Sequence, residues 1–166
     1  AEWRKHIVDA LKNRLHIISG LHCHVSDDPE FRQLAHDHQV EIWDVRKPPE
    51  DIPLGTGKAK ETKTLRILTV GSDCNIGKMV TSIEITNTAK KRGINACFVA
   101  TGQTGIMIDG SGIAVDHVIS DFISGAAERL VLERARYQLL SIEGQGTIVH
   151  PAYSGVTLGL LHGSAP

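Results

Sequence analysis

Aromatic residues are scarce in this sequence and make up only 4% of its 166 residues. Because the formal net charge is also only -1, the chain offers neither a stacking platform nor a basic surface for nucleic acid. No apolar run approaches the roughly 20 residues that a membrane-spanning helix needs, and the first residues lack the apolar core of a signal peptide. We therefore expect a cytoplasmic protein with no nucleic-acid partner and no membrane partner.

Cysteine is also rare. Cys23, Cys74 and Cys97 are an odd number of thiols without CxxC spacing, so the sequence suggests neither a disulfide framework nor a zinc knuckle. His22 and His24 flank the first of them, but side chains two apart in an extended segment point in opposite directions. This triplet is therefore interpreted as a loop at the end of a strand, and no metal site is predicted.

Helix and strand patterns alternate over the first 46 residues. The expected elements are a helix from Glu2 to about Leu15, a strand over 16–20, a helix that starts within 27–29 and ends near His38, and a strand over 40–45. The start of the second helix is indicated by an acidic N-cap residue followed by Pro29 in the first turn. This order predicts that residues 1–46 are the C-terminal part of a Rossmann-like N-terminal domain.

The composition changes in the next segment. Residues 47–63 hold three prolines, two glycines and interspersed charges, which is typical of a linker or a connection along the surface. From residue 64 to 166, strands expected over 65–70, 94–100 and 138–142 alternate with helices expected over 78–92 and 120–135. This alternation predicts a three-layer α/β/α domain with a mostly parallel sheet and ligands at the carboxyl ends of the strands.

A P-loop motif lies between the first of these strands and the first helix. Its glycines permit positive φ angles and turn backbone N–H groups toward a phosphate, while the following helix adds its positive end. The strand before the motif and the helix after it are the context that this motif requires. The predicted phosphate-binding residues are Gly71, Ser72, Asp73, Cys74, Asn75, Ile76, Gly77, Lys78 and Met79.

Met79 departs from the complete motif. A serine or threonine normally follows the lysine and ligates Mg²⁺, whereas a thioether is a poor ligand for a hard cation. Thr81 and Ser82 lie further along the helix. Two interpretations stay open: Mg²⁺ binds through other groups, or the loop holds a nucleotide moiety that it does not hydrolyse.

Further candidates follow the second and third strands of this domain. Glu143 ends the third strand, where a carboxylate could hold Mg²⁺ through water or act as a general base. His150 is a second candidate for acid–base catalysis. Gln103 and Thr104 follow the second strand on the same rim of the sheet, and Tyr153 follows the Glu143 turn. These last three residues are predicted to bind substrate.

Part of the chain, residues 68–105, resembles dethiobiotin synthetase and its relatives. The shared features are the P-loop, a helix ending in Lys-Arg-Gly, and the Gln-Thr-Gly turn at residue 103. The Glu-Gly-x-Gly turn at residue 143 is also similar. The resemblance implies a P-loop fold with ATP and Mg²⁺, but Met79 replaces the magnesium-binding hydroxyl, and Ala100 stands where that group has a substrate-phosphate lysine.

A second resemblance covers nearly the whole chain. Its motifs are Gly20-Leu21-His22, Asp27-Asp28-Pro29, Asp44-Val45-Arg46-Lys47-Pro48-Pro49, Gly71-Ser72-Asp73-Cys74, Gly77-Lys78-Met79 and Glu143-Gly144-Gln145-Gly146. Together they resemble the DgcN-like family, which pairs a Rossmann-like domain with a P-loop domain and includes D-glutamate N-acetyltransferase. Met79 agrees with the pattern of that family.

The family resemblance implies transfer of acetyl from acetyl-CoA to the amine of D-glutamate. Our hypothesis is that Lys78 and the backbone amides of the P-loop hold CoA phosphates, and we expect a homo-oligomer. Members are about twice as long as this chain, so the P-loop domain over 64–166 is expected to be incomplete. The alternatives are an ATP- and Mg²⁺-dependent ligase or kinase of the synthetase type, and a non-catalytic nucleotide-binding module.

Overall fold

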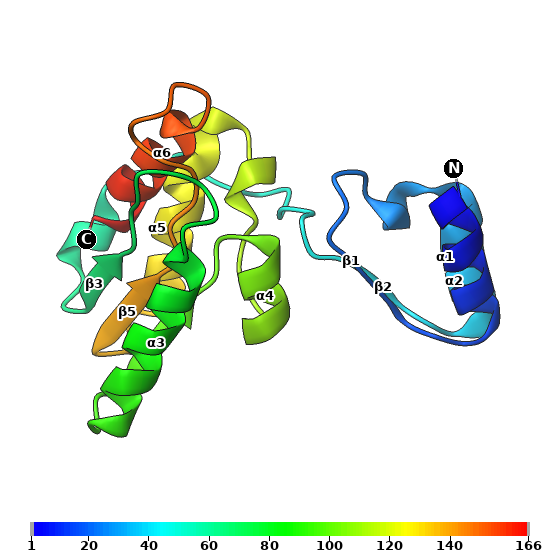
Figure 1. The fold of residues 1–166 in the computed structure, drawn as a ribbon, viewed down its shortest axis with the longest axis horizontal. Helices are drawn as coiled ribbons and strands as arrows, with labels where there is room; N and C mark the ends of the chain where they lie inside the picture. The colour runs from blue at the N-terminus through cyan, green and yellow to red at the C-terminus, as the bar shows by residue number, and fades with distance from the viewer. Residues whose placement is uncertain (1, 166) are drawn as a thin grey trace. The chain divides into compact units, whose positions relative to one another are not determined.

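The chain forms two compact units, and the division between them falls between Lys47 and Pro48. The computed structural model describes residues 2–165 and is drawn in Figure 1. Helices and strands alternate in both units and all strand pairs are parallel, which confirms the predicted α/β class. None of the described helices combines the length and the apolar character that crossing a bilayer requires.

The first unit is a small α/β unit built on two parallel strands. Its elements are α1 (Glu2–Lys12), β1 (Ile17–Ser19), the 3-10 helix η1 (Val25–Asp27), α2 (Pro29–His38) and β2 (Ile42–Asp44). Leu11 of α1 and Phe31 of α2 are fully buried and centre its core. The predicted start of α2 is confirmed, because the side chain of Asp28 accepts hydrogen bonds from two backbone N–H groups of the first turn.

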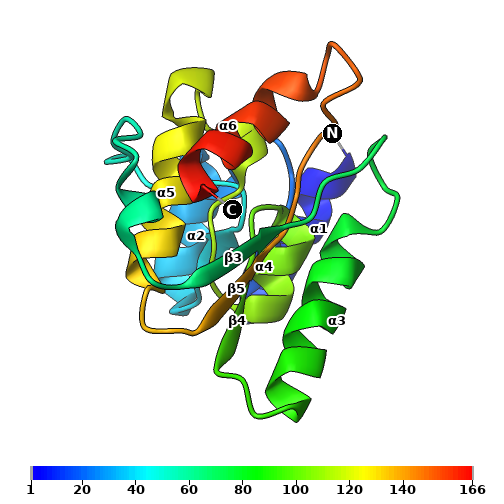
Figure 2. The ribbon, with the colours of Figure 1, turned by 90° about the vertical axis from the view of Figure 1, so that its left-hand side faces the viewer.

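The second unit has three layers. Its elements are η2 (Lys58–Glu61), β3 (Leu65–Leu68), α3 (Lys78–Lys91), β4 (Ala96–Val99), α4 (Gln103–Asp109), η3 (Val115–His117), η4 (Ser120–Phe122), α5 (Ile123–Glu133), β5 (Leu139–Ile142) and α6 (Ser154–Ser164). The parallel strands are ordered β3-β5-β4. Figure 2 shows α3 on one side of these strands and α5 with α6 on the other. The predicted three-layer P-loop arrangement is therefore confirmed.

The two faces of β5 explain the layers. Leu139 packs with Ala89 of α3, whereas the next residue, Leu140, packs with Leu130 of α5. Neighbouring side chains of a strand point to opposite faces, so an apolar strand can be covered by helices on both sides. A polar pair also joins α3 to the sheet, because the Ser82 and Ser141 hydroxyl oxygens lie 2.8 Å apart in the buried interior.

Two α-helices of the described residues were not predicted from the sequence. The Gly-rich stretch over 101–112 contains α4, and the glycine-containing segment before the C-terminus forms α6. The glycines of α6 serve close packing: a Cβ on Gly163 would lie 2.0 Å from the Ser124 carbonyl oxygen, and one on Gly159 would lie 2.5 Å from Ile123 Cγ2. Low intrinsic helix propensity is here outweighed by contact with α5.

The carboxylate of Glu128 is one of the groups that fix the segment predicted as a linker or surface connection to α5. Glu128 is only 4% exposed and accepts hydrogen bonds from the Thr56 N–H at 2.7 Å, the Thr56 hydroxyl at 2.9 Å and the Ala59 N–H at 3.2 Å. Burial disfavours its charge, but these hydrogen bonds outweigh burial and hold the pKa of Glu128 below the ordinary value. Ala59 is itself buried in the core.

We expect Glu128→Gln to lower the free energy of unfolding at neutral pH by about 2 kcal/mol, because an amide accepts through only one oxygen. A carboxylate with a lowered folded-state pKa stabilises above its unfolded pKa, and this stabilisation is lost as the pH falls through the folded pKa. In denaturant titrations at several pH values, the free energy of unfolding of the variant should therefore fall less steeply toward acid pH than that of the unsubstituted chain. Glu133→Gln, on the exposed side of the same helix, should change stability by less than about 0.5 kcal/mol.

Candidate phosphate-binding site

The P-loop connects β3 to α3 with the backbone geometry that its glycines permit. Gly77 adopts φ 96° and caps α3, which begins at Lys78. Asn75 is also left-handed, with φ 56°. The ammonium group of Lys78 reaches back over the loop and donates to the Asp73 carbonyl oxygen at 2.6 Å. A positive charge and the N-terminal end of a 14-residue helix therefore lie at the same loop, which is an arrangement that attracts anions.

A pocket of about 320 Å³ lies at the carboxyl ends of the three strands. Its lining comes from three segments: the P-loop and first turn of α3 (74, 75 and 77–80), the start of α4 (102–104), and the turn after β5 (143–146). The structure thus brings Gln103, Thr104 and Glu143 together with Lys78 and Met79. Each segment directly follows one strand of the parallel sheet, which explains why they meet.

Other predicted site residues lie outside this lining. Four residues of the loop, Gly71, Ser72, Asp73 and Ile76, do not line the pocket, and neither do His150 and Tyr153. The His150 and Tyr153 rings stack on each other with their centroids 4.8 Å apart. His150 Nδ1 also accepts from the Ala152 N–H at 3.2 Å.

Glu143 is the buried acid of the pocket, at 4% exposed. One carboxylate oxygen, Oε2, accepts from the Thr101 N–H at 2.9 Å and the Gly102 N–H at 3.0 Å. Burial raises the pKa of Glu143 above its ordinary value, although these hydrogen bonds oppose the shift. The side chain is therefore fixed in direction and holds a proton more readily than an exposed glutamate does.

Two threonines that are absent from the predicted site residues shape the turn after β5. Thr69 Oγ1 accepts from the Gly144 N–H at 2.9 Å, and the Thr101 hydroxyl donates to the Glu143 carbonyl oxygen at 2.6 Å. Both are buried. The one available signal was their position, because Thr69 directly follows β3 and Thr101 comes two residues after the end of β4. They hold the Glu143 turn against the ends of β3 and β4.

The residues after Lys78 supply no hydroxyl to this pocket. Met79 and Val80 line it, but Thr81 and Ser82 do not. Ser82 is fully buried and bonded to Ser141 of the sheet. The oxygen that would ligate Mg²⁺ in a complete motif is therefore missing from its usual position, and neither neighbouring hydroxyl replaces it.

A parallel α/β/α sheet with this loop at its carboxyl end defines a P-loop protein. The chain belongs to the DUF1611 family: residues 53–166 match its P-loop domain, described as a domain of unknown function (DUF1611_C), and residues 1–48 match its Rossmann-like domain (DUF1611_N). A crystal structure of a DUF1611 family protein from Anabaena variabilis superposes with a TM-score of 0.94 at 40% identity, covering 99% of this chain and 48% of that one.

Two curated relatives carry the name D-glutamate N-acetyltransferase. The relative from Pseudoalteromonas is 46% identical and the one from Tritonibacter scottomollicae is 41% identical, each over 165 residues and 99% of this chain. The chain spans 49% of the length of each relative. The predicted membership of a family that includes this enzyme is thereby confirmed.

Proposed function

We propose that this chain carries the CoA-binding P-loop of an N-acetyltransferase that moves acetyl from acetyl-CoA to the amine of D-glutamate. The observation that carries the proposal is a P-loop pocket whose position after Lys78 holds Met79 instead of a magnesium-binding hydroxyl. The names of the two relatives, which are 41–46% identical, support the reaction class.

CoA suits this pocket chemically. It carries a pyrophosphate and a separate 3′-phosphate, and these anions need donors and positive charge but no in-line hydrolysis. Lys78 and the backbone N–H groups at the start of α3 supply both. Because no phosphoryl group is transferred, a magnesium ligand after Lys78 is unnecessary, and Met79 is compatible with the role.

Glu143 is the base in this proposal. The ammonium group of the amino acid first gives a proton to Glu143, and the lone pair of the neutral amine attacks the thioester carbonyl carbon. A C–N bond forms, the C–S bond breaks, the nitrogen loses a second proton, and the CoA thiolate leaves and takes up one proton. Glu143 lines the pocket, and its raised pKa makes it a stronger proton acceptor when ionised. His150 lies outside the lining, so the role of base falls to Glu143.

Gln103 and Thr104 are the proposed substrate contacts, because they line the pocket beside Glu143. An amide and a hydroxyl are suitable partners for the carboxylates of glutamate. Tyr153 lies outside the lining and takes no part in this arrangement.

Lys78→Ala tests the phosphate role. We expect the Kd for CoA to rise about tenfold to 100-fold, since the variant loses a charged donor to phosphate. The measurement is titration calorimetry, with Lys91→Ala as control because Lys91 is an exposed lysine at the other end of α3. Equal Kd values for the Lys78 variant and the unsubstituted chain would exclude the P-loop as the CoA site.

The reaction itself is tested by mass spectrometry of N-acetylglutamate formed from acetyl-CoA and D-glutamate. Product formation that is lost in Lys78→Ala supports the proposal. Activity that instead requires ATP and Mg²⁺ would establish the ligase or kinase alternative. CoA binding without any acetyl transfer would favour a non-catalytic nucleotide-binding module.

A further inference from the structure

A second pocket of about 700 Å³ lies at the amino end of β4, on the side of that strand that no other strand covers within residues 2–165. It is distinct from the P-loop pocket, because the two share no lining residue. Its walls come from the ends of α3, α4 and α5 and from the turn before β5. The volume is within the range of small-molecule sites.

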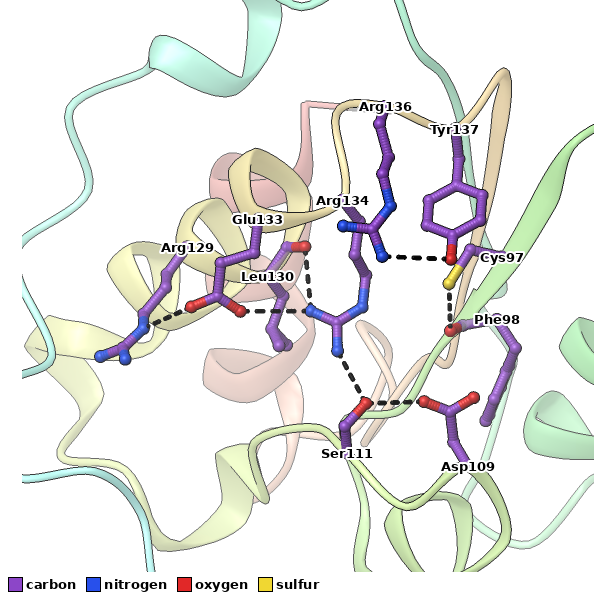
Figure 3. A network of polar contacts seen from close by, with 10 residues as sticks. All are labelled: Cys97, Phe98, Asp109, Ser111, Arg129, Leu130, Glu133, Arg134, Arg136 and Tyr137. Carbon is purple, nitrogen blue, oxygen red and sulfur yellow. Dashed lines mark hydrogen bonds and ion pairs between the residues drawn. The ribbon is translucent and has the colours of Figure 1, made fainter.

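Several residues of this lining belong to a network of hydrogen bonds and ion pairs, which Figure 3 shows. Arg134 donates to Ser111 Oγ at 3.0 Å and to the Leu130 carbonyl oxygen at 3.3 Å, which fixes its guanidinium group. The guanidinium carbon of Arg136 lies 5.0 Å from the centroid of the Tyr137 ring. Lys90 contributes a third cation from the end of α3.

The two carboxylates of the lining are already engaged. Glu133 accepts from Arg129 at 2.9 Å and from Arg134 at 3.3 Å, and Asp109 accepts from the Ser111 hydroxyl at 2.9 Å. Within residues 2–165, no ion pair involves Lys90 or Arg136. The cations Lys90, Arg134 and Arg136 outnumber the carboxylates Asp109 and Glu133 in the lining, and Glu133 is already shared with Arg129 outside it, so the lining carries a net positive charge.

We propose that this second pocket binds the oxyanion group, phosphate or carboxylate, of a small molecule. Lys90 and Arg136 attract the anion, Arg134 is a pre-positioned donor, and the Tyr137 hydroxyl lies beside Arg136 at 3.4 Å. No group of the CoA site is involved, so this site would stand even if the proposed acetyltransferase function were wrong.

The three cysteines supply a built-in test, because each reports on a different place. Cys97 lines the second pocket, Cys74 lines the P-loop pocket, and Cys23 is an exposed thiol of the first unit. Burial raises the pKa of the Cys97 thiol, so its alkylation should be slow and sensitive to whatever enters the pocket. Alkylation rates at each site can be read in one mass-spectrometry experiment.

The probes are inorganic phosphate and glutarate, each compared with chloride at the same ionic strength. We expect saturating probe to slow alkylation of Cys97 at least about threefold while Cys23 is unaffected. Protection by both probes identifies a general oxyanion site, and protection by one identifies the preferred group. No protection by either, or equal protection of Cys23, would overturn the proposal.

Charge removal then locates the site. Lys90→Gln and Arg136→Gln should each raise the concentration of probe that half-protects Cys97 about tenfold. Lys91→Gln is the matched control, because Lys91 is the adjacent exposed lysine and does not line the pocket. If Lys90→Gln and Lys91→Gln raise the half-protecting probe concentration equally while both variants keep the same thermal stability, Lys90 has no special role in the pocket. The proposal then fails.

Discussion

Replacing Glu143 by glutamine should lower kcat/KM for acetyl transfer by about 100-fold to 10,000-fold, the usual contribution of a general base. The glutamine side chain is nearly isosteric, and its oxygen can accept the Thr101 and Gly102 N–H groups that the Oε2 atom of Glu143 accepts now. The fold should therefore persist while the proton acceptor is lost. Initial rates at varied D-glutamate concentration measure the effect.

The same substitution should change how stability depends on pH. The raised folded-state pKa of Glu143 means that the folded chain binds the proton more tightly than the unfolded chain does. Stability then falls as the pH rises from the ordinary value of 4.5 through the raised pKa. Glu143→Gln should remove this decline, which denaturant titrations across that pH interval would show.

Glu84→Gln is the control for both measurements, because Glu84 is exposed on α3 and does not line the P-loop pocket. It should leave rate and pH dependence unchanged. A Glu143→Gln variant that keeps full activity would rule out Glu143 as the base. Loss of activity together with unfolding would instead show that the carboxylate serves the turn alone.

Gly144→Ala should lower the free energy of unfolding by about 3 kcal/mol or more, because the added methyl meets backbone rather than a movable side chain. A Cβ at this position would lie 1.6 Å from the Thr69 carbonyl oxygen and 2.8 Å from its carbonyl carbon. Relief requires β3 and the turn to separate, and this breaks the 2.9 Å bond between the Gly144 N–H and Thr69 Oγ1. CoA affinity should fall as well, since Gly144 lines the pocket.

Gly155→Ala provides the matched control. A Cβ on Gly155 meets nothing within 4 Å, and the residue lies near the start of α6. Alanine there should be neutral or should stabilise by up to about 1 kcal/mol, through the lower entropy of the unfolded chain. Thermal or urea unfolding compares the two variants. Similar stabilities for both would contradict the close approach of the turn to β3.

The sequence was sufficient for the parts of the fold that local chemistry determines. An apolar strand, glycines at fixed spacing and a following helix define the P-loop without help from distant residues. The helices α4 and α6 depend on more. Gly159 and Gly163 lower the helix propensity of α6, but they allow α5 to pack closely against this helix. Such long-range contacts leave no local pattern in the sequence.

Some features of the candidate site could likewise be predicted from the sequence, and others could not. Because parallel strands bring the residues that follow them to one edge, the sequence could place Gln103, Thr104 and Glu143 beside Lys78. It could not show that Glu143 is pinned by two backbone N–H groups, since that depends on how the end of β4 meets the end of β5. Nor could it separate His150 from the pocket lining, because the 148–153 segment has no regular pattern.

In the proposed function, the P-loop holds CoA phosphates without a metal. Titration calorimetry of the chain with CoA, in the presence and absence of Mg²⁺, tests it most directly, with ATP titrated under the same two conditions. We expect CoA to bind with a Kd that Mg²⁺ changes by less than about twofold, because Met79 offers no ligand to a hard cation. Tight binding of ATP only with Mg²⁺, together with no detectable binding of CoA, would contradict it.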